Sequence, residues 1–170
     1  MATVRDTPAT RVAKFAAMSA ALTGFKPDFI APKLDPNQLN AHLLHHADEL
    51  AGATSVDQLL EQFTALQAQG QTSQQIADVM LGISPSSSAP AVLLARSIVK
   101  LWYLGSWYPP DGSTSAFNGN VVSSQAYTSG LAWRVMQTHA MGDSPFKFGY
   151  WTSAPPSLSE FGADVPEHKS

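Results

Sequence analysis

The spacing of apolar residues predicts helices throughout the first half of the chain. Thr7 and Pro8 are typical of an N-cap followed by proline in the first turn, so a first helix is expected from Pro8 to just before Gly24, a natural stop. A second cap signature in residues 35–38, with Gln38 in the capping-box position, precedes leucines and alanines that recur at helical spacing. We therefore expect a second helix that ends before Gly52.

Three further helical patterns follow. Ser55 begins the first of them and Gly70 closes it, and residues 73–81 form a shorter one. Serines and prolines in residues 84–90 predict a loop. The last pattern, over residues 91–104, is apolar almost all round, apart from a narrow polar strip of Arg96, Ser97 and Lys100. Such a helix is covered on most sides, either by helices of this chain or by a second protein.

The composition changes after this apolar helix. Residues 102–151 contain all four tryptophans, all four tyrosines and three of the eight phenylalanines, but only four charged side chains. Turn-forming residues at 108–112 and a brief helical pattern at 125–136, with little other periodicity, predict mostly irregular structure. We therefore expect a mainly α fold, a small helical bundle with a long, irregular, aromatic-rich C-terminal extension.

The chain is expected to form a single domain over residues 1–170. Its length and its 44% hydrophobic residues suffice for one sizeable core. Within the domain we distinguish a helical N-terminal part, a Ser/Pro loop, the apolar helix with an aromatic partner-binding segment, and a polar tail (7–83, 84–90, 91–156 and 157–170).

Charge and cysteine content exclude several classes of protein. Only 14% of the residues are charged and the formal net charge is −3, so no basic surface for nucleic acid is expected. The lack of cysteine excludes disulfides, thiolate metal sites and iron–sulfur clusters in this chain. No apolar run approaches the roughly 20 residues of a membrane-spanning helix, so no direct membrane span is expected.

Four side chains of the second predicted helix resemble a metal site. His42, His45, His46 and Glu49 fall within one arc of the helix, and a His-x3-His-x2-Glu face can hold a divalent ion. This arc lies opposite the leucine face and lacks an apparent fourth ligand. We therefore expect an ordinary, solvated polar surface rather than a metal site.

His139 is the only histidine of the aromatic segment, and Ser123, Ser124, Asp143 and Ser144 could complete a nucleophilic triad with it. No Gly-x-Ser-x-Gly motif accompanies them, so a packed, hydrogen-bonded histidine is expected instead. Gly-x-Gly-x-x-Gly and phosphate-loop motifs do not occur either. The chain is therefore not expected to bind a dinucleotide or a flavin by itself.

The aromatic segment has three interpretations. Aromatic residues and methionine with few charges are typical of the centre of a protein interface. A domain of this size also places tryptophan in its own core, and the composition alone favours neither use over the other. Stacking on sugar rings is a third use of such side chains.

Three separated blocks of sequence resemble a known family. The first, Phe15–Gly24, has the pattern F-x-x-x-S-x-x-L-T-G, and the second, Leu101–Tyr108, contains W-Y-x-G at a predicted helix end. The third runs from Val121 to Trp151 and contains G-L-A-W and F-G-Y-W. In order and spacing, the blocks resemble the small (gamma) subunit of membrane-bound, FAD-dependent sugar and sugar-alcohol dehydrogenases, the sorbitol, fructose and glucose dehydrogenase type.

The resemblance implies a non-catalytic subunit. In this family the FAD and the sugar-oxidising residues belong to a large subunit, and a cytochrome c subunit often carries electrons onward. The small subunit is implied to assist folding, flavin loading and export of the large subunit, and to remain bound to it. No catalytic residue, cofactor or metal is therefore expected in this chain, and FAD is expected in its partner.

We expect the aromatic segment to contact the large subunit, because large aromatic side chains dominate the binding energy of interfaces. Trp102, at a helix end, is the residue that could instead fill the core of this chain. The alternative function is a free-standing carbohydrate- or protein-binding module that uses the same cluster. The expected partner-binding residues are Trp102, Trp107, Tyr108, Phe148, Tyr150 and Trp151.

Two departures from the family pattern concern location and linkage. Many relatives carry a twin-arginine export signal, whereas the short apolar stretch 15–22 of this chain favours an amphipathic helix over a signal peptide. The complex is nevertheless expected in the periplasm, with this chain processed, carried by its partner, or left behind in the cytoplasm. Some relatives have a cysteine in the C-terminal half, and its absence here excludes a covalent link through this chain.

Overall fold

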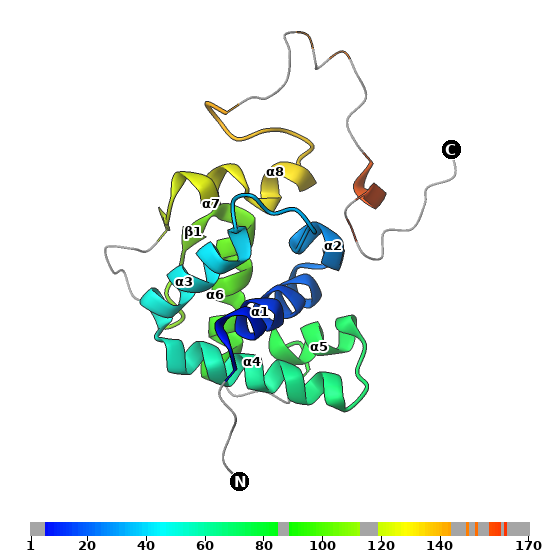
Figure 1. Cartoon of the computed structure of the whole chain (residues 1–170), viewed down its shortest axis with the longest axis vertical. Coiled ribbons are helices and arrows are strands. Elements are labelled where there is room, and N and C mark those ends of the chain that lie inside the picture. The colour runs from blue at the N-terminus through cyan, green and yellow to red at the C-terminus, as the bar shows by residue number, and fades with distance from the viewer. Residues whose placement is uncertain are drawn as a thin grey trace.

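The computed structural model of the chain is mainly helical, as the sequence predicts (Figure 1). It describes residues 6–84, 89–112 and 119–143, together with Gly149, Thr152, 157–160 and Gly162. The helices are α1 (Pro8–Thr23), α2 (Pro27–Ile30), α3 (Leu39–Ala51), α4 (Ala53–Ala68), α5 (Ser73–Met80), α6 (Ala89–Leu104), α7 (Ser124–Thr128), α8 (Leu131–Val135) and the 3-10 helix η2 (Leu158–Glu160). A short antiparallel ladder joins β1 (Ser106–Trp107) to β2 (Asn120–Val121).

Helix α1 begins and ends at the residues that the sequence predicts. The N–H of Thr10 donates to the hydroxyl of Thr7 at 3.2 Å, and Pro8 occupies the first turn. Gly24 follows the helix with a φ of 74°, a left-handed conformation that glycine adopts at little cost. Its N–H donates to the Ala20 carbonyl at 3.1 Å, so both ends of the helix are capped as expected.

Helices α3 and α4 lie where the sequence predicts them, but their first residues differ from the prediction. The Asp35 carboxylate accepts a hydrogen bond from the N–H of Leu39 at 2.9 Å. Gln38, expected to complete a capping box, is instead left-handed with a φ of 49° and makes no side-chain cap. Helix α4 begins at Ala53, two residues before the predicted start at Ser55. The cap signatures in the sequence therefore predict the correct helical segments but not the first residue of each helix.

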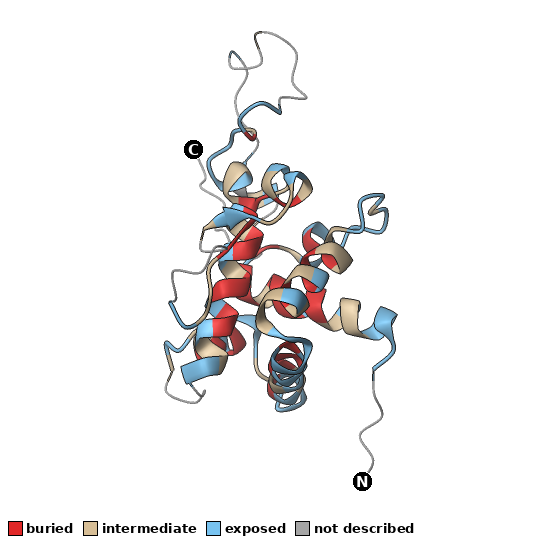
Figure 2. Cartoon of the chain, turned by 90° about the vertical axis from the view of Figure 1, so that its left-hand side faces the viewer, coloured by how far each residue is buried: buried red, intermediate tan, exposed pale blue. Residues whose placement is uncertain are grey.

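Helix α6 is the central helix of the fold. It contacts α1, α3, α4, α5, α7 and α8, and buried residues are concentrated along it (Figures 1 and 2). Helices of this chain therefore supply most of its cover, and Leu93 and Leu104 stay 41% and 43% exposed. Ser97, predicted on the polar strip, is only 3% exposed, and its hydroxyl donates to the Leu93 carbonyl at 3.1 Å. The polar strip is thus narrower than the sequence predicts.

The predicted helix over 125–136 is divided into α7 and α8. Gly130 lies between them, and a Cβ at this position would lie 2.8 Å from the Tyr103 carbonyl oxygen. Cβ atoms do not approach a backbone oxygen so closely, so the chain turns at a glycine to pack against the end of α6. A tertiary contact, which local sequence does not encode, explains the division.

One hydrophobic cluster connects the helices on both sides of the Ser/Pro loop. It includes Phe15 of α1, Phe63 of α4, Ile98 of α6 and Leu131 of α8, each at most 2% exposed. Burying one such side chain stabilises the fold by about 1.5–3 kcal/mol. The helical N-terminal part and the beginning of the C-terminal part therefore share a core.

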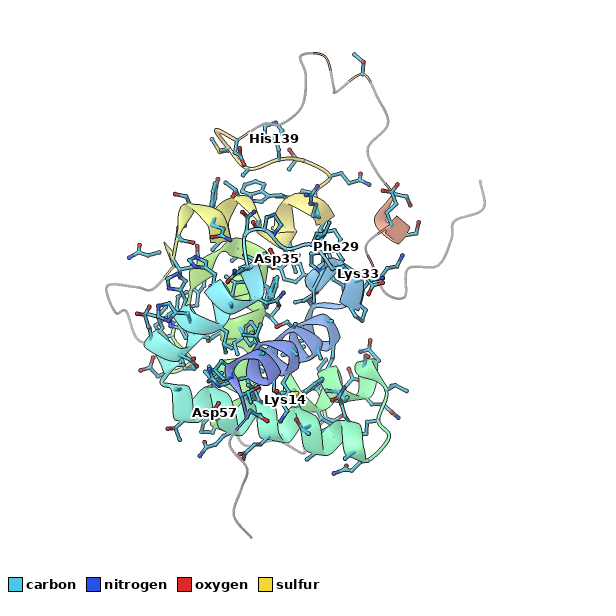
Figure 3. All side chains as sticks on the ribbon, viewed as in Figure 1. Lys14, Phe29, Lys33, Asp35, Asp57 and His139 are labelled. Carbon is cyan, nitrogen blue, oxygen red and sulfur yellow. The ribbon has the colours of Figure 1, made fainter. Side chains whose placement is uncertain are left out.

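A charged group ties three helices together beside this core. Arg11 of α1 donates two hydrogen bonds to the Asp48 carboxylate of α3 and one, at 2.6 Å, to Asp57 of α4. Hydrogen bonding to Asp48, and then to Asp57, raises the pKa of Arg11 above its ordinary value. Figure 3 labels Asp57 on α4 and Lys14 on α1.

The helices are short relative to a lipid bilayer. The longest, α1, α4 and α6, have 16 residues each, against the roughly 20 that span the hydrocarbon layer. Among the described residues, no helix combines the length and the apolar character that a membrane crossing requires. This finding agrees with the prediction of no direct membrane span.

Candidate functional site

Trp102, one of the expected partner-binding residues, lies in the core. It occupies the last turn of α6 and is 2% exposed. Its indole N–H donates to the Ser19 hydroxyl at 2.8 Å, and its ring stacks on Phe15 with the centroids 6.4 Å apart. Because a buried indole N–H needs an acceptor, Ser19 makes this site suitable for tryptophan. Trp102 therefore holds α1 against α6.

Trp107, the expected central anchor, is buried as well. It is 1% exposed and belongs to the same hydrophobic cluster as Trp102. In β1 it lies opposite Asn120 of β2, and its carbonyl accepts from the N–H of Gly119 at 2.8 Å. A side chain with so little exposed surface offers nothing to a partner in this conformation. Trp107 is therefore a core residue of this structure.

Tyr108 differs from the two tryptophans because part of its surface stays accessible. Its ring lies against the hairpin, 3.4 Å from the position of a Cβ on Gly119. The Lys100 ammonium lies 4.9 Å from the ring centroid, a cation–π contact that orients the ring. Three further expected anchors lie outside the described residues, namely Phe148, Tyr150 and Trp151.

The three sequence blocks that carry the family resemblance meet in space. The Tyr103 hydroxyl of the second block donates to the Thr23 carbonyl of the first at 3.0 Å. The second and third blocks meet at Gly105, where a Cβ would come within 2.5 Å of the Ala126 backbone. The Gly105 carbonyl also accepts from the N–H of Val122 at 2.9 Å. The end of α6 is therefore the point at which all three blocks converge.

Exposed apolar side chains are frequent in the described residues that follow β1. Val121, Val135, Met136 and Met141 are each 44% or more exposed. Among residues 6–84 and 89–104, Leu34 and Ile83 exceed this exposure, and Phe29, Leu93 and Leu104 are 37–43% exposed. Exposed methionine and other large apolar groups are typical of surfaces that contact another protein. The region after β1 therefore offers candidate contact residues beyond those that the sequence analysis selected.

The four side chains considered as a metal site divide into an exposed and a partly buried pair. His45 and Glu49 are 65% and 56% exposed, as expected of a polar surface. His42 instead contacts α7, with its Nε2 2.7 Å from the Ser123 hydroxyl. His46, 18% exposed, lies edge-on to His42, and burial lowers its pKa. The expected full solvation is thus wrong for His42 and His46, because α7 packs against α3.

The same residues have no geometry that would hold an ion. Within the part of the chain that the structure describes, no group of three or more histidine, aspartate or glutamate side chains is arranged to bind a metal. The partial burial of His42 and His46 instead links the helical part to α7. This arc of α3 therefore contributes to the contact between α3 and α7.

His139 lies beyond α8, at the end of the molecule away from α4 and α5 (Figure 3). Its Nδ1 donates to the Ala140 carbonyl at 2.9 Å, which agrees with the prediction of a hydrogen-bonded histidine. The Ser123 hydroxyl caps α7 by accepting from the N–H of Ala126 at 3.0 Å, and it also contacts His42. Ser144 lies outside the described residues. Ser123 therefore has a structural role, because it caps α7 and contacts His42 of α3.

A contact that the sequence analysis missed joins the end of the described chain to the α1–α2 junction. The Lys26 ammonium donates to the Ser159 carbonyl at 2.6 Å and lies 3.4 Å from the Glu160 carbonyl oxygen. Phe25 and Gly162 form an isolated antiparallel β-bridge. The sequence analysis assigned the residues around η2 to a tail, because partners 133 positions apart leave no local pattern. We name this contact the C-terminal clasp.

Comparison with known proteins adds no relative. No family model, curated protein or solved structure matches this chain. The family resemblance therefore depends on the three sequence blocks themselves.

Proposed function

We propose that this chain is the non-catalytic small subunit of an FAD-dependent sugar or sugar-alcohol dehydrogenase complex. In this role it binds the large, FAD-containing subunit and supports its folding, flavin loading or export. The flavin and the sugar-oxidising residues belong to the large subunit, and a cytochrome c subunit carries electrons onward. The complex acts in the periplasm and reaches the membrane through the partners of this chain.

The observation that supports the proposal most strongly is the contact among the three resemblance blocks. Trp102 of the W-Y-x-G motif binds Ser19 of the first block, and Gly105 of the same motif lies against Ala126 of the third. Their packing around the end of α6 is what a shared structural requirement predicts.

We assign the contact with the large subunit to the region after β1. Tyr108 supplies a partly exposed aromatic ring there, and the exposed apolar side chains of residues 119–143 enlarge the surface. Phe148, Tyr150 and Trp151 are the further proposed anchors. Trp102 and Trp107 are omitted from the proposed interface, because their side chains fill the core. A central anchor is worth about 2 kcal/mol or more of binding free energy.

Binding alone accounts for the supporting role. A subunit that binds the folded large subunit but not its unfolded form stabilises the folded form by mass action. Because FAD is bound by the folded form, the fraction of flavin-loaded enzyme rises with it. No chemical step in this chain is needed for the effect.

The test is to express the candidate FAD-containing large subunit from the same genome with and without this chain. Flavin content per large subunit and dye-linked sugar oxidation are then measured after purification. We expect soluble, flavin-loaded enzyme only when this chain is present and co-purifies. An equally active, flavin-loaded enzyme without it would contradict the proposal. Binding of sugars by the isolated chain would then favour the free-standing carbohydrate-binding module.

A further inference from the structure

Two long-range hydrogen bonds join α7 to the beginning of α3. The Nε2 of His42 lies 2.7 Å from the Ser123 hydroxyl, and the side-chain amide of Gln125 donates to the Asn37 carbonyl, also at 2.7 Å. The bonded residues are 81 and 88 positions apart in the chain, so both bonds are tertiary contacts. We name these two contacts the α3–α7 seam.

The backbone is strained at the seam. Gln38 directly follows Asn37 and has a φ of 49°, in the left-handed region. This conformation is costly for a residue with a Cβ, and it persists where the surrounding contacts hold it. The contact beside it is the hydrogen bond from Gln125 to the Asn37 carbonyl. The strain therefore lies where the scaffold helices meet α7.

The position of α7 also determines the position of exposed apolar side chains on both sides of it. Val121 in β2 precedes α7 and is 49% exposed, and Val135 in α8 follows it and is 44% exposed. The indole N–H of Trp133 in α8 donates to the Tyr127 carbonyl of α7 at 2.7 Å, and the two rings lie edge-on, with centroids 5.3 Å apart. Figure 1 shows α7 and α8 next to each other at the upper end of α6. Helix α8 is therefore coupled to α7.

We propose that the α3–α7 seam positions the apolar surface of β2 and α8 for the large subunit, with His42 and Gln125 as its positioning residues. This inference rests on the proposed function. One side of α7 packs against Gly105 at the end of α6, and the seam holds the side that faces α3. A surface that already has its bound arrangement loses less conformational entropy on binding. The affinity therefore rises with the fraction of molecules in which the seam is closed.

The decisive variants are His42→Phe and Gln125→Leu, alone and together. Phenylalanine keeps a ring at position 42 without its nitrogen atoms, and leucine removes the amide donor. The matched control is His45→Phe, at a side chain of the same helix that is 65% exposed. His42→Gln, which returns an amide close to the position of Nε2, tests rescue. Each full-length variant is co-expressed with the candidate large subunit, and the Kd of the complex is measured. Amide hydrogen exchange at Tyr127 and Ser129, whose N–H groups donate within α7 and at its end, reports whether α7 is held.

We expect the double variant to exchange faster in α7 and to bind the large subunit about tenfold more weakly, because the seam is then closed in about a tenth of the molecules. Its helical content should stay unchanged. Each single variant should show a smaller change in the same direction. His45→Phe should match the native chain, and His42→Gln should recover most of the affinity that His42→Phe loses.

Faster exchange in α7 with native affinity would overturn the positioning role, as would unchanged exchange in the double variant. Equal losses of affinity in His42→Gln and His42→Phe would also overturn it. If the double variant loses helical content, the single variants decide by the same criteria. These outcomes leave binding by the native chain intact. If the native chain itself fails to bind the large subunit, the proposed function is wrong, and the positioning role is overturned with it.

Discussion

The helical part that ends with α6 and the region that follows Gly105 are held in different ways. In the helical part, apolar residues at helical spacing bury one face after another against α6. In the later region, single contacts fix the chain, such as the indole N–H of Trp133, which donates to the Tyr127 carbonyl at 2.7 Å. Many similar contacts make the first part robust, whereas the second depends on a few specific ones.

The two parts also differ in what they leave exposed. Both parts contribute to the core, because Phe15 and Ile98 of the first part and Trp107 and Leu131 of the second are each at most 2% exposed. The short stretch of residues 119–143, however, contains four large apolar side chains that are 44% or more exposed. A closed core and an open apolar surface serve different purposes. The first part acts as a scaffold, and we infer that the second is shaped for a partner.

The largest effect is expected from Trp102→Ala, which removes the main contact between the two resemblance blocks of the scaffold. It creates a cavity beside Phe15 and leaves the Ser19 hydroxyl without its indole donor. We expect a loss of about 3–5 kcal/mol in the free energy of unfolding, measured by urea titration. Val135→Ala, at a side chain 44% exposed, should cost less than about 0.5 kcal/mol. Similar losses in both variants would contradict the division into core and surface.

A smaller effect is expected at the junction of the two regions. Gly105 and Gly112 both have positive φ values, 62° and 69°, so alanine is strained at both. A Cβ at Gly105 would meet the Ala126 backbone at 2.5 Å, whereas a Cβ at Gly112 has no neighbour within 4 Å. Gly105→Ala should therefore destabilise the chain by about 1–3 kcal/mol more than Gly112→Ala in the same titration. Equal losses would show that α7 does not pack against Gly105.

The smallest effect is a pH dependence at the seam between α3 and α7. Burial and the neighbouring His42 lower the pKa of His46, whereas the unfolded chain keeps the ordinary value of about 6.5. As the pH falls through that value, the unfolded chain binds a proton that the folded chain resists, so stability decreases toward acid.

This dependence can be isolated by substitution. Urea titrations of His46→Gln between about pH 7.5 and 5 should show a shallower loss of stability than those of the native chain. His45→Gln, at a side chain 65% exposed, is the comparison and should change the slope less, because His45 lowers the pKa of His46 by less than burial and His42 do. A native slope in His46→Gln would assign the acid sensitivity to other groups.

Local signals explain which parts of the fold could be predicted. The cap at Thr7 and the stop at Gly24 are encoded by neighbouring residues, and both ends of α1 were predicted from them. The division at Gly130 depends on Tyr103 of another helix. The contact between His42 and Ser123 joins residues 81 positions apart. Such contacts cannot be derived from local spacing.

The candidate interface was harder to predict for a related reason. Tryptophan with few neighbouring charges is typical both of an interface and of a core, so composition could not separate the two for Trp107. The structure separates them through burial, at 1% exposed for Trp107 and partial exposure for Tyr108. The clasp was missed because the partners Lys26 and Ser159 are 133 positions apart.

The most direct test of the account is amide hydrogen exchange of the full chain, alone and in complex with the candidate large subunit. The account predicts that binding slows exchange after β1, in residues 119–143. Exchange in α4 and α5, which belong to the scaffold, should stay unchanged. Protection confined to α4 and α5, or no change anywhere in the chain, would contradict the assignment of the partner contact to the region after β1.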